Sequence, residues 1–399
     1  GHYEMYDGSL AADQLGIRAY LHSTGWGFYD GGLNTLSQAA GTCSVRELAM
    51  GNGAEYVLQG GSLEVREAAV VRGRIVQSGG VASFQSLLLH GDDAAYELSA
   101  GRLTAGTVTV SPWSETEVVP DGVQQTGGTA EITALTVEER GRYELASGSL
   151  QIGTSMVLTG SLDFAGGDGA LQFLGGATGN FASGQILNAA GASMAAAADT
   201  HLYFPEGFNP YTDLLHYQCE GQTHLFADVL EVAAGQTAYL SGGVGSRVRC
   251  AGTVLAQGGA AAPRLLKGVE LLASGRIDLG AEGEVVVDDD LSSVAGGELT
   301  AWRMRVGTDT SAGQLIQSGG TVTVGDIGLF VGAFHDGDEG TYVLQDGSLT
   351  TTETWVGLTG VGVFRQDGGT HAPEALRIGT GRDGQGTYEM SGGTLDSEL

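Results

Sequence analysis

One short pattern recurs along the chain and constrains its fold more than any other feature: a large apolar residue, any residue, and then Leu, Met or Gln before a glycine turn. The clearest copies begin at Tyr3, Tyr56, Tyr96, Tyr143, Tyr342 and Tyr388. Other copies carry Gln in the third place, at Gln77, Gln125, Gln317 and Gln366. A unit of about 20 to 29 residues that returns this often is typical of a solenoid, in which each repeat contacts only its neighbours along one axis.

Each repeat has the pattern of a strand, a turn and a second strand. Residues one and three of the pattern share a face of an extended segment, and both are large. The turn is Gly-Gly, Asp-Gly or Ser-Gly, which supplies the positive φ that other residues resist. We therefore expect an all-β chain that forms a right-handed parallel β-helix, or β-solenoid, with coils about 4.8 Å apart. The expected core ladder consists of Tyr3, Tyr56, Tyr96, Tyr143, Tyr342, Phe364 and Tyr388.

The third position of the pattern alternates between Leu or Met and Gln, so the true period is double. Tyr accompanies Leu or Met, whereas Ile, Val, Leu or Phe accompanies Gln. Two arrangements fit this alternation: a coil of about 23 residues that stacks on complementary neighbours, or a coil of about 46 residues that carries two motifs and stacks like on like. We favour the shorter coil, in which bulk is traded between the two positions.

The motif is clear over 1–150 and 296–399, and it is degenerate over 151–295. We expect N-terminal solenoid repeats, a degenerate solenoid and C-terminal solenoid repeats in these three segments. An irregular insert at about 200–225 concentrates aromatic residues, His and Pro. It is interpreted either as a projecting loop that binds a ligand or as a packing element that covers the core. The candidate ligand-binding side chains are Tyr203, Phe204, Phe208, Tyr211 and Tyr217.

The chain is strongly acidic, with 47 Asp and Glu against 18 basic residues and a formal net charge of −29. Nucleic acid and anionic membrane surfaces are therefore not expected as partners. Membrane insertion is not expected either, since no stretch of 18 apolar residues occurs. A high net charge of this kind can be explained by solubility alone, because it keeps a β-rich protein with exposed strand edges from aggregating. The only cofactor considered is Ca²⁺, although the spacing matches no known Ca²⁺ loop. Its candidate ligands are Asp288, Asp289, Asp290, Asp336 and Asp338.

Three cysteines are too widely spaced for a zinc or redox motif. Cys219 and Cys250 are a candidate disulfide in an oxidising compartment. Cys43 is then expected to be a small buried apolar residue, with an intermolecular bridge as the alternative. No enzyme activity is expected, because the single G-x-G-x-x-G match at 379–384 is unremarkable in so glycine-rich a chain. The one catalytic arrangement considered joins the acidic run 288–290 to Arg303 or Arg305.

The phrase Gly-Thr-Tyr-Glu-Met-Ser-Gly-Gly-Thr-Leu at 386–395, together with 316–322, resembles the G-x-Y-x-L-S-G-G-x-L repeats of bacterial secreted and surface proteins. These are autotransporter-type passengers and exoproteins that carry sorting signals. The resemblance covers 1–150 and 296–399. It implies an extracellular β-helix at the bacterial cell surface, with adhesive or structural roles and no catalytic residues.

These patterns predict an extracellular structural protein, the subunit of a surface filament. The sequence starts and stops within a motif, so the last coil of one copy is expected to stack head to tail on the first coil of the next. The expected contact residues are Tyr3, Met5, Leu10, Tyr388, Met390 and Leu395. The alternative is an adhesin or autotransporter-like passenger that binds a surface or glycan through the central insert.

Overall fold

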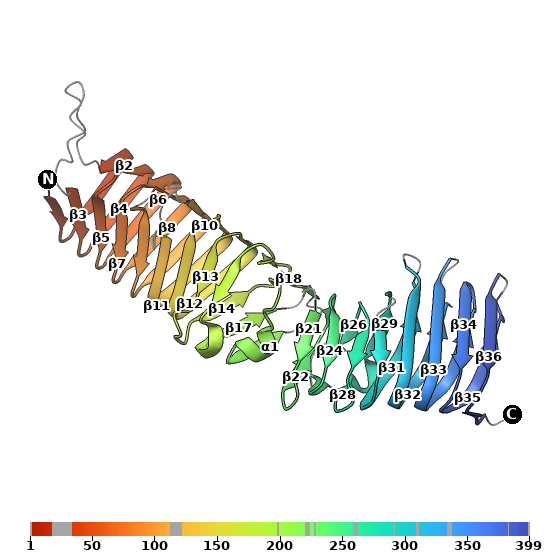
Figure 1. The fold of residues 1–399 in the computed structure, drawn as a ribbon. Helices are drawn as coiled ribbons and strands as arrows, with labels where there is room; N and C mark the ends of the chain where they lie inside the picture. The colour runs from red at the N-terminus through yellow and green to blue at the C-terminus, as the bar shows by residue number, and fades with distance from the viewer. Residues whose placement is uncertain are drawn as a thin grey trace, which may run out of the picture. The chain divides into compact units, whose positions relative to one another are not determined.

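The chain is nearly all β. The computed structural model describes residues 2–17, 34–91, 93–111, 122–197, 199–219, 224–226, 229–257, 262–289, 292–308, 311–332, 337–381 and 383–397, and at 34, 219 and 224–226 it describes the backbone alone. Strands hold 67% of the residues and helices 3%, and the parallel strands stack into a β-solenoid of about 15 turns (Figure 1). The predicted fold class is confirmed.

Two compact units divide the chain. Unit 1 comprises Gly1–Phe208 and Asp213–Gln218, and unit 2 comprises Asn209–Thr212 and Cys219–Leu399. The division falls inside the stretch 151–295, where the motif is degenerate. Each unit is described below by itself.

Unit 1 is a stack of parallel strands, and from β1 to β9 every other strand carries the repeat phrase. Its elements are β1 (His2–Met5), β2 (Ser9–Ile17), β3 (Asn34–Gln38), β4 (Thr42–Met50), β5 (Ala54–Leu58), β6 (Ser62–Val71), β7 (Arg74–Gln77), β8 (Val81–His90), β9 (Ala95–Leu98), β10 (Arg102–Ser111), β11 (Gly122–Val137), β12 (Arg142–Leu158), β13 (Ser161–Asp163), β14 (Ala170–Phe173), β15 (Thr178–Asn180), β16 (Gln185–Leu187), η1 (Ala189–Gly191), β17 (Ser193–Ala196), β18 (His201–Tyr203) and β19 (His216–Cys219). Strands β1, β3, β5, β7 and β9 pair in sequence, and β9 pairs with β11.

The pairing register shows that one coil carries one motif. Tyr56 of β5 is aligned with Ile75 of β7, which is aligned with Tyr96 of β9. At the third position the column runs from Leu58 to Gln77 and on to the next leucine. Each tyrosine motif therefore stacks on a glutamine motif. This confirms the shorter coil, which carries one motif and stacks on complementary neighbours.

Corner glycines are required both by backbone conformation and by close stacking. Gly61 has φ +75° and Gly101 has φ +90°, in the left-handed region that side chains disfavour. A Cβ on Gly61 would lie 2.2 Å from the carbonyl oxygen of Gly41 in the preceding coil. Each corner therefore rests directly on the backbone of the corner before it, which explains why the turn dipeptide is the best preserved part of the repeat.

Unit 2 continues the same stacking within its own coils. Its elements are α1 (Pro210–Asp213), β20 (His224–Phe226), β21 (Val229–Val232), β22 (Thr237–Leu240), β23 (Gly243–Val244), β24 (Arg247–Cys250), β25 (Thr253–Ala256), β26 (Arg264–Leu265), β27 (Val269–Leu271), β28 (Arg276–Asp278), η2 (Gly280–Glu282), β29 (Glu284–Val287), β30 (Ser292–Val294), β31 (Glu298–Val306), β32 (Gly313–Val331), β33 (Glu339–Val356), β34 (Val361–Gln366), β35 (Thr370–Ile378), β36 (Gln385–Met390) and β37 (Thr394–Leu395).

The degenerate stretch is a regular solenoid with shorter strands. Its coils contain three strands of two to four residues each: β21, β22 and β23 pair with β24, β25 and β26, and these pair with β27, β28 and β29. Alternate residues of β21, β22 and β24 are buried. The stacking thus persists where the repeat phrase is lost.

Candidate functional site

The core ladder is built on hydrogen bonds between neighbouring coils. Tyr56, Tyr96, Tyr143, Tyr342 and Phe364 are fully buried. Each buried tyrosine hydroxyl donates to the side-chain carbonyl of a Gln in the preceding coil. The pairs, extended by Tyr388, are Tyr56 with Gln38 (2.5 Å), Tyr96 with Gln77 (2.5 Å), Tyr143 with Gln125 (2.8 Å), Tyr342 with Gln317 (2.6 Å) and Tyr388 with Gln366 (2.7 Å).

The Gln side chain also uses both of its amide hydrogens. Gln125 Nε2 donates to the carbonyl oxygen of Gly128 in its own corner (3.3 Å) and to that of Ser149 in the next coil (2.9 Å). Because a buried hydroxyl needs a partner, each tyrosine coil requires a glutamine coil before it. Burial raises the pKa of Tyr143, which keeps its hydroxyl a neutral donor. The double period therefore reflects hydrogen bonding between neighbouring coils, and not only the exchange of side-chain volume that the sequence predicts.

One glutamine of this set was missed in the sequence. Gln38 follows Leu36 in the repeat phrase, but Ala39-Ala40-Gly41 replaces the Gly-Gly turn. Its Nε2 donates to the carbonyl oxygens of Gly41 and Ser62, both at 3.0 Å. The three-residue pattern of an apolar residue, any residue and Gln would have identified this copy of the repeat, even though its turn has a single glycine.

The residues expected to form head-to-tail contacts lie in two coils of the same type. Tyr3 is 54% exposed and Met390 is 49% exposed, so these two members of the set reach solvent in this structure. Strand β1 is aligned with β3, and β36 is aligned with β34. Both coils have Tyr first and Met third. Tyr3 is therefore not buried as predicted, since β1 pairs with β3 alone among the strands that the structure describes.

The central aromatic residues form a packed cluster in unit 1. Phe204 is 3% exposed, and its ring stacks on Phe181 at 5.6 Å and on Phe208 at 5.5 Å. Tyr217 meets Phe204 edge to face at 6.3 Å. Strand β18 stacks on β15, so the first part of the expected insert belongs to the solenoid. This arrangement favours the packing interpretation for Phe204, Phe208 and Tyr217. Tyr203 is 37% exposed.

Tyr211 lies in unit 2, on the four-residue helix α1. Its backbone N–H donates to Asn209 Oδ1 at 3.0 Å, and Tyr211 is half-buried. The five aromatic side chains proposed for one ligand site are therefore divided between the two units.

Two of the acidic residues considered for Ca²⁺ have partners within the protein. Asp288 Oδ2 forms an ion pair with Lys267 Nζ at 2.6 Å. Asp289 Oδ1 accepts a hydrogen bond from Ser292 Oγ at 3.0 Å. Asp338 is 1% exposed. Asp290 and Asp336 lie outside the described residues. In the part of the chain that the structure describes, no group of three His, Cys, Asp or Glu side chains could hold a metal ion.

The proposed disulfide is not formed. Cys250 is a free, buried thiol whose Sγ donates to the carbonyl oxygen of Gly252 at 3.4 Å, and the Cys219 side chain lies outside the description. Burial raises the pKa of Cys250. The free thiol of Cys250, which is one of the buried residues of β24, contradicts the predicted pairing. Cys43 is also free and buried, as expected for a small apolar residue.

Glu284 of unit 2 is a buried carboxylate held by three arginines. Its Oε1 pairs with Arg303 (2.9 Å) and Arg305 (2.7 Å), and its Oε2 pairs with Arg264 (2.9 Å). Burial alone raises the pKa of Glu284, but the hydrogen bond from Arg303 and the charges of all three arginines outweigh it, so the pKa lies below its usual value. The two arginines considered for catalysis with 288–290 thus hold this carboxylate.

Replacing Glu284 with Gln is expected to lower the free energy of unfolding by about 1 to 2 kcal/mol, because a neutral amide cannot balance three guanidinium groups and water reaches Arg264. Urea unfolding of the full chain at pH 7 measures this loss. The control is Glu298→Gln, because the Glu298 side chain is 69% exposed and 3.8 Å from Arg276. The native carboxylate contributes its stability above its usual pKa, and this contribution disappears as the pH falls through the lower native value. Equal effects of the two substitutions would contradict this account.

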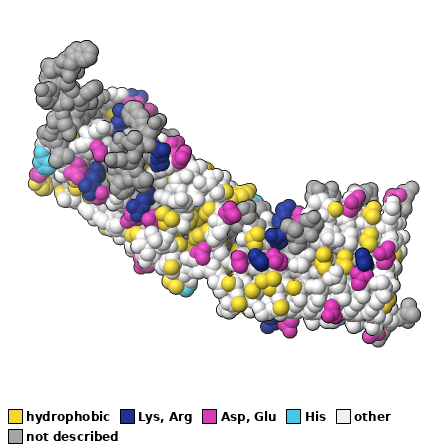
Figure 2. Space-filling model, viewed as in Figure 1, with side chains coloured by type: hydrophobic (Ala, Val, Ile, Leu, Met, Phe, Trp, Pro, Cys, Tyr) yellow, Lys and Arg dark blue, Asp and Glu magenta, His cyan; other side chains and the backbone are white. Residues whose placement is uncertain are grey.

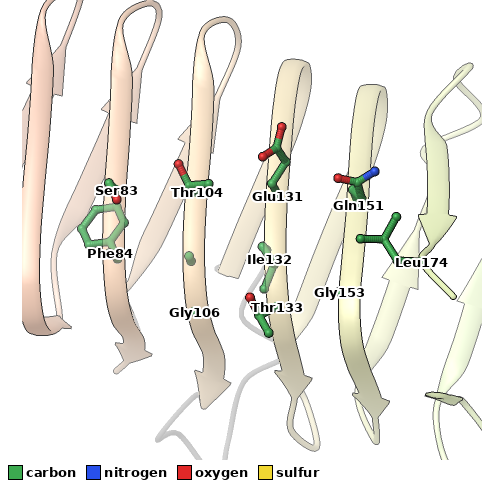
Figure 3. A pocket seen from close by; sticks show the side chains of 11 residues that line it. Ser83, Phe84, Thr104, Gly106, Glu131, Ile132, Thr133, Gln151, Gly153 and Leu174 are labelled. Carbon is green, nitrogen blue, oxygen red and sulfur yellow. The ribbon is translucent and has the colours of Figure 1, made fainter. Parts of the chain in front are cut away.

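A groove of about 380 Å³ lies on the outer surface of unit 1. It crosses β8, β10, β11 and β12, and Figure 3 shows Thr104, Glu131 and Gln151 along one side of it. Gly106 and Gly153 lie on the other side, together with Thr133. The repeat phrase does not predict this groove, because its two glycines lie within strands and away from the motif's corners.

Charged side chains of both signs are interspersed over the visible face of each unit (Figure 2). Many are paired between coils, such as Arg74 with Glu97 and Arg102 with Glu131. Within the described residues, no helix has the length and apolar character needed to cross a bilayer. No protein-family model, curated protein or solved structure matches this chain.

Proposed function

We propose that the protein is an extracellular structural protein of the bacterial cell surface, in which the solenoid units serve as stiff spacers. The observation that carries the proposal is the repeated Tyr–Gln hydrogen bond, which fastens each tyrosine coil to the coil before it inside the core. About 15 turns at roughly 4.8 Å per turn supply roughly 70 Å of stacked coil. The resemblance of the repeat phrase to secreted and surface proteins supports the location.

Direct head-to-tail stacking of the coils of Tyr388 and Tyr3 would leave a tyrosine hydroxyl without a glutamine acceptor. A direct contact between the coil of Tyr388 and the coil of Tyr3 would place two tyrosine coils together. In the five pairs described above, each tyrosine coil instead follows a glutamine coil, which accepts its buried hydroxyl. The chemistry of the core therefore favours a spacer over a polymer formed by direct stacking of these two coils.

Sedimentation velocity and electron microscopy over a concentration series, with and without a chelator, test the proposal. We expect single copies at every concentration, with a frictional ratio well above that of a globular protein of 40.8 kDa. Sedimentation as a compact globule would contradict the spacer. Filaments with a uniform axial repeat would instead support the surface fibre, and their loss on chelation would place Ca²⁺ at the junction.

The second candidate is an adhesin. The groove of unit 1 favours it, because ligand sites are concave surfaces that combine an apolar lining with a few polar groups, and this groove contains both. Phe204 and Phe208 pack against each other, so the groove is a better candidate for the ligand site of an adhesin than the central aromatic cluster.

A further inference from the structure

The floor of the groove in unit 1 is shaped by two glycines in one axial column. A Cβ on Gly106 would lie 2.5 Å from the carbonyl oxygen of Gln85, and a Cβ on Gly153 would lie 3.2 Å from Cα of Thr133. Thr133 is exposed between them. At both glycines the backbone of the neighbouring coil leaves little room for a Cβ, so Thr133 is the one side chain of this column that lines the groove (Figure 3).

The wall of the groove presents a fixed row of polar groups. Thr104, Glu131 and Gln151 are aligned by the pairing of β10 with β11 and of β11 with β12. Their spacing is therefore that of the coils, about 4.8 Å. The row offers a hydroxyl, a carboxylate and an amide, and so combines groups that accept and groups that donate hydrogen bonds.

Two neighbours set the charge and orientation of this row. Arg102 pairs with Glu131 Oε2 and compensates its charge, which leaves Oε1 to accept from a ligand. Gln151 Nε2 donates to Gln172 Oε1 at 3.3 Å, which directs the amide. The exposed side chain of Leu174 supplies an apolar contact at one end of the groove.

The geometry points to a binding site for a short, neutral, linear oligosaccharide in this groove. A sugar ring has an apolar C–H face and a rim of hydroxyls that both donate and accept, which matches Leu174 beside the polar row. A polyanion is disfavoured by the net charge of −29. An extended peptide is disfavoured because the strands lining the groove are interior strands whose backbone groups are paired on both sides. This inference is independent of the spacer function.

Titration calorimetry of the full chain tests the site, with cellohexaose, chitohexaose and maltohexaose as probes. Thr133→Trp fills the groove from an exposed position, so we expect binding to be lost or weakened by at least about tenfold. Gln151→Ala and Thr104→Val each remove one hydrogen-bonding group, and each is expected to weaken binding roughly 3- to 10-fold. The matched control is Thr126→Trp on the same strand, which is exposed but outside the groove lining.

Circular dichroism of each variant separates loss of binding from loss of fold. Binding by the native chain that Thr133→Trp abolishes and Thr126→Trp preserves would support the site. No binding of any of the three probes at millimolar concentration would overturn the inference, as would equal affinity in the native chain and in folded Thr133→Trp. Preferential binding of dextran sulfate or of an extended peptide at this groove would also overturn it.

Discussion

Replacing Gln125 with Leu is expected to lower the free energy of unfolding of the coils in unit 1 by about 3 kcal/mol. Leucine fits the column, since Leu98 and Leu145 flank this position. It removes the acceptor of the buried Tyr143 hydroxyl and the donor to two backbone carbonyl oxygens. Each buried polar group left without a partner costs about 1 to 3 kcal/mol, and the two carbonyls are only partly buried, so the expected total lies below the full sum.

A double-mutant cycle isolates the hydrogen bond from the change in shape. Tyr143→Phe in the native background leaves Gln125 unsatisfied, whereas in the Gln125→Leu background it removes an orphaned hydroxyl. We expect the second substitution to recover about 1 to 2 kcal/mol of the loss. Hydrogen exchange of the full chain measures this through the opening free energies of β11 and β12. If Tyr143→Phe has the same cost in both backgrounds, the Tyr–Gln bond contributes no coupling between coils.

The sequence predicted the fold because the features that determine a solenoid are local. Glycine at a corner and large residues at alternate positions recur in every regular coil, and each coil meets only its neighbours. The alternation of Leu with Gln was visible as well, but its cause was not. A hydroxyl and an amide become partners only when the register places Tyr96 after Gln77, and no spacing within one repeat carries that information.

The candidate sites were less predictable because they join residues from different coils. Glu284 meets arginines from the coil before it and the coil after it, at separations of about 20 residues. The groove is lined by residues of several coils, such as Gly106 and Gly153, which become one surface only after stacking. Cys250 was assigned to a disulfide because a sequence shows the number of thiols and not the side of the strand on which each lies.

A buried histidine near the C-terminal coils is expected to make this part of the chain sensitive to acid. His371 is fully buried in unit 2 and stacks on Phe364 at 4.6 Å. Its Nδ1 lies 3.0 Å from the Tyr388 hydroxyl, and its Nε2 lies 3.1 Å from Thr354 Oγ1. Tyr388 donates to Gln366, so it accepts from His371 Nδ1–H, and Nε2 accepts from the threonine. The network thus holds the neutral ring in one tautomer.

Burial lowers the pKa of His371 from 6.5 to about 4. Between these two values the unfolded chain binds a proton that the folded chain does not bind, so stability is greatest above pH 6.5 and falls as the pH approaches 4. The difference in pKa corresponds to about 3 kcal/mol. Burial raises the pKa of Tyr388 to about 12, so its hydroxyl stays neutral throughout this range.

Replacing His371 with Leu removes this titration while preserving the column, because Leu349 precedes this position and Leu395 follows it. Urea unfolding of the full chain, followed by tryptophan fluorescence, is expected to show a loss of about 3 kcal/mol between pH 6.5 and 4 in the native protein that His371→Leu lacks. NMR titration of the imidazole, assigned by its absence in the variant, measures the pKa directly. An ordinary pKa for His371, or the same pH slope in both proteins, would show that the buried ring does not control the acid stability of these coils.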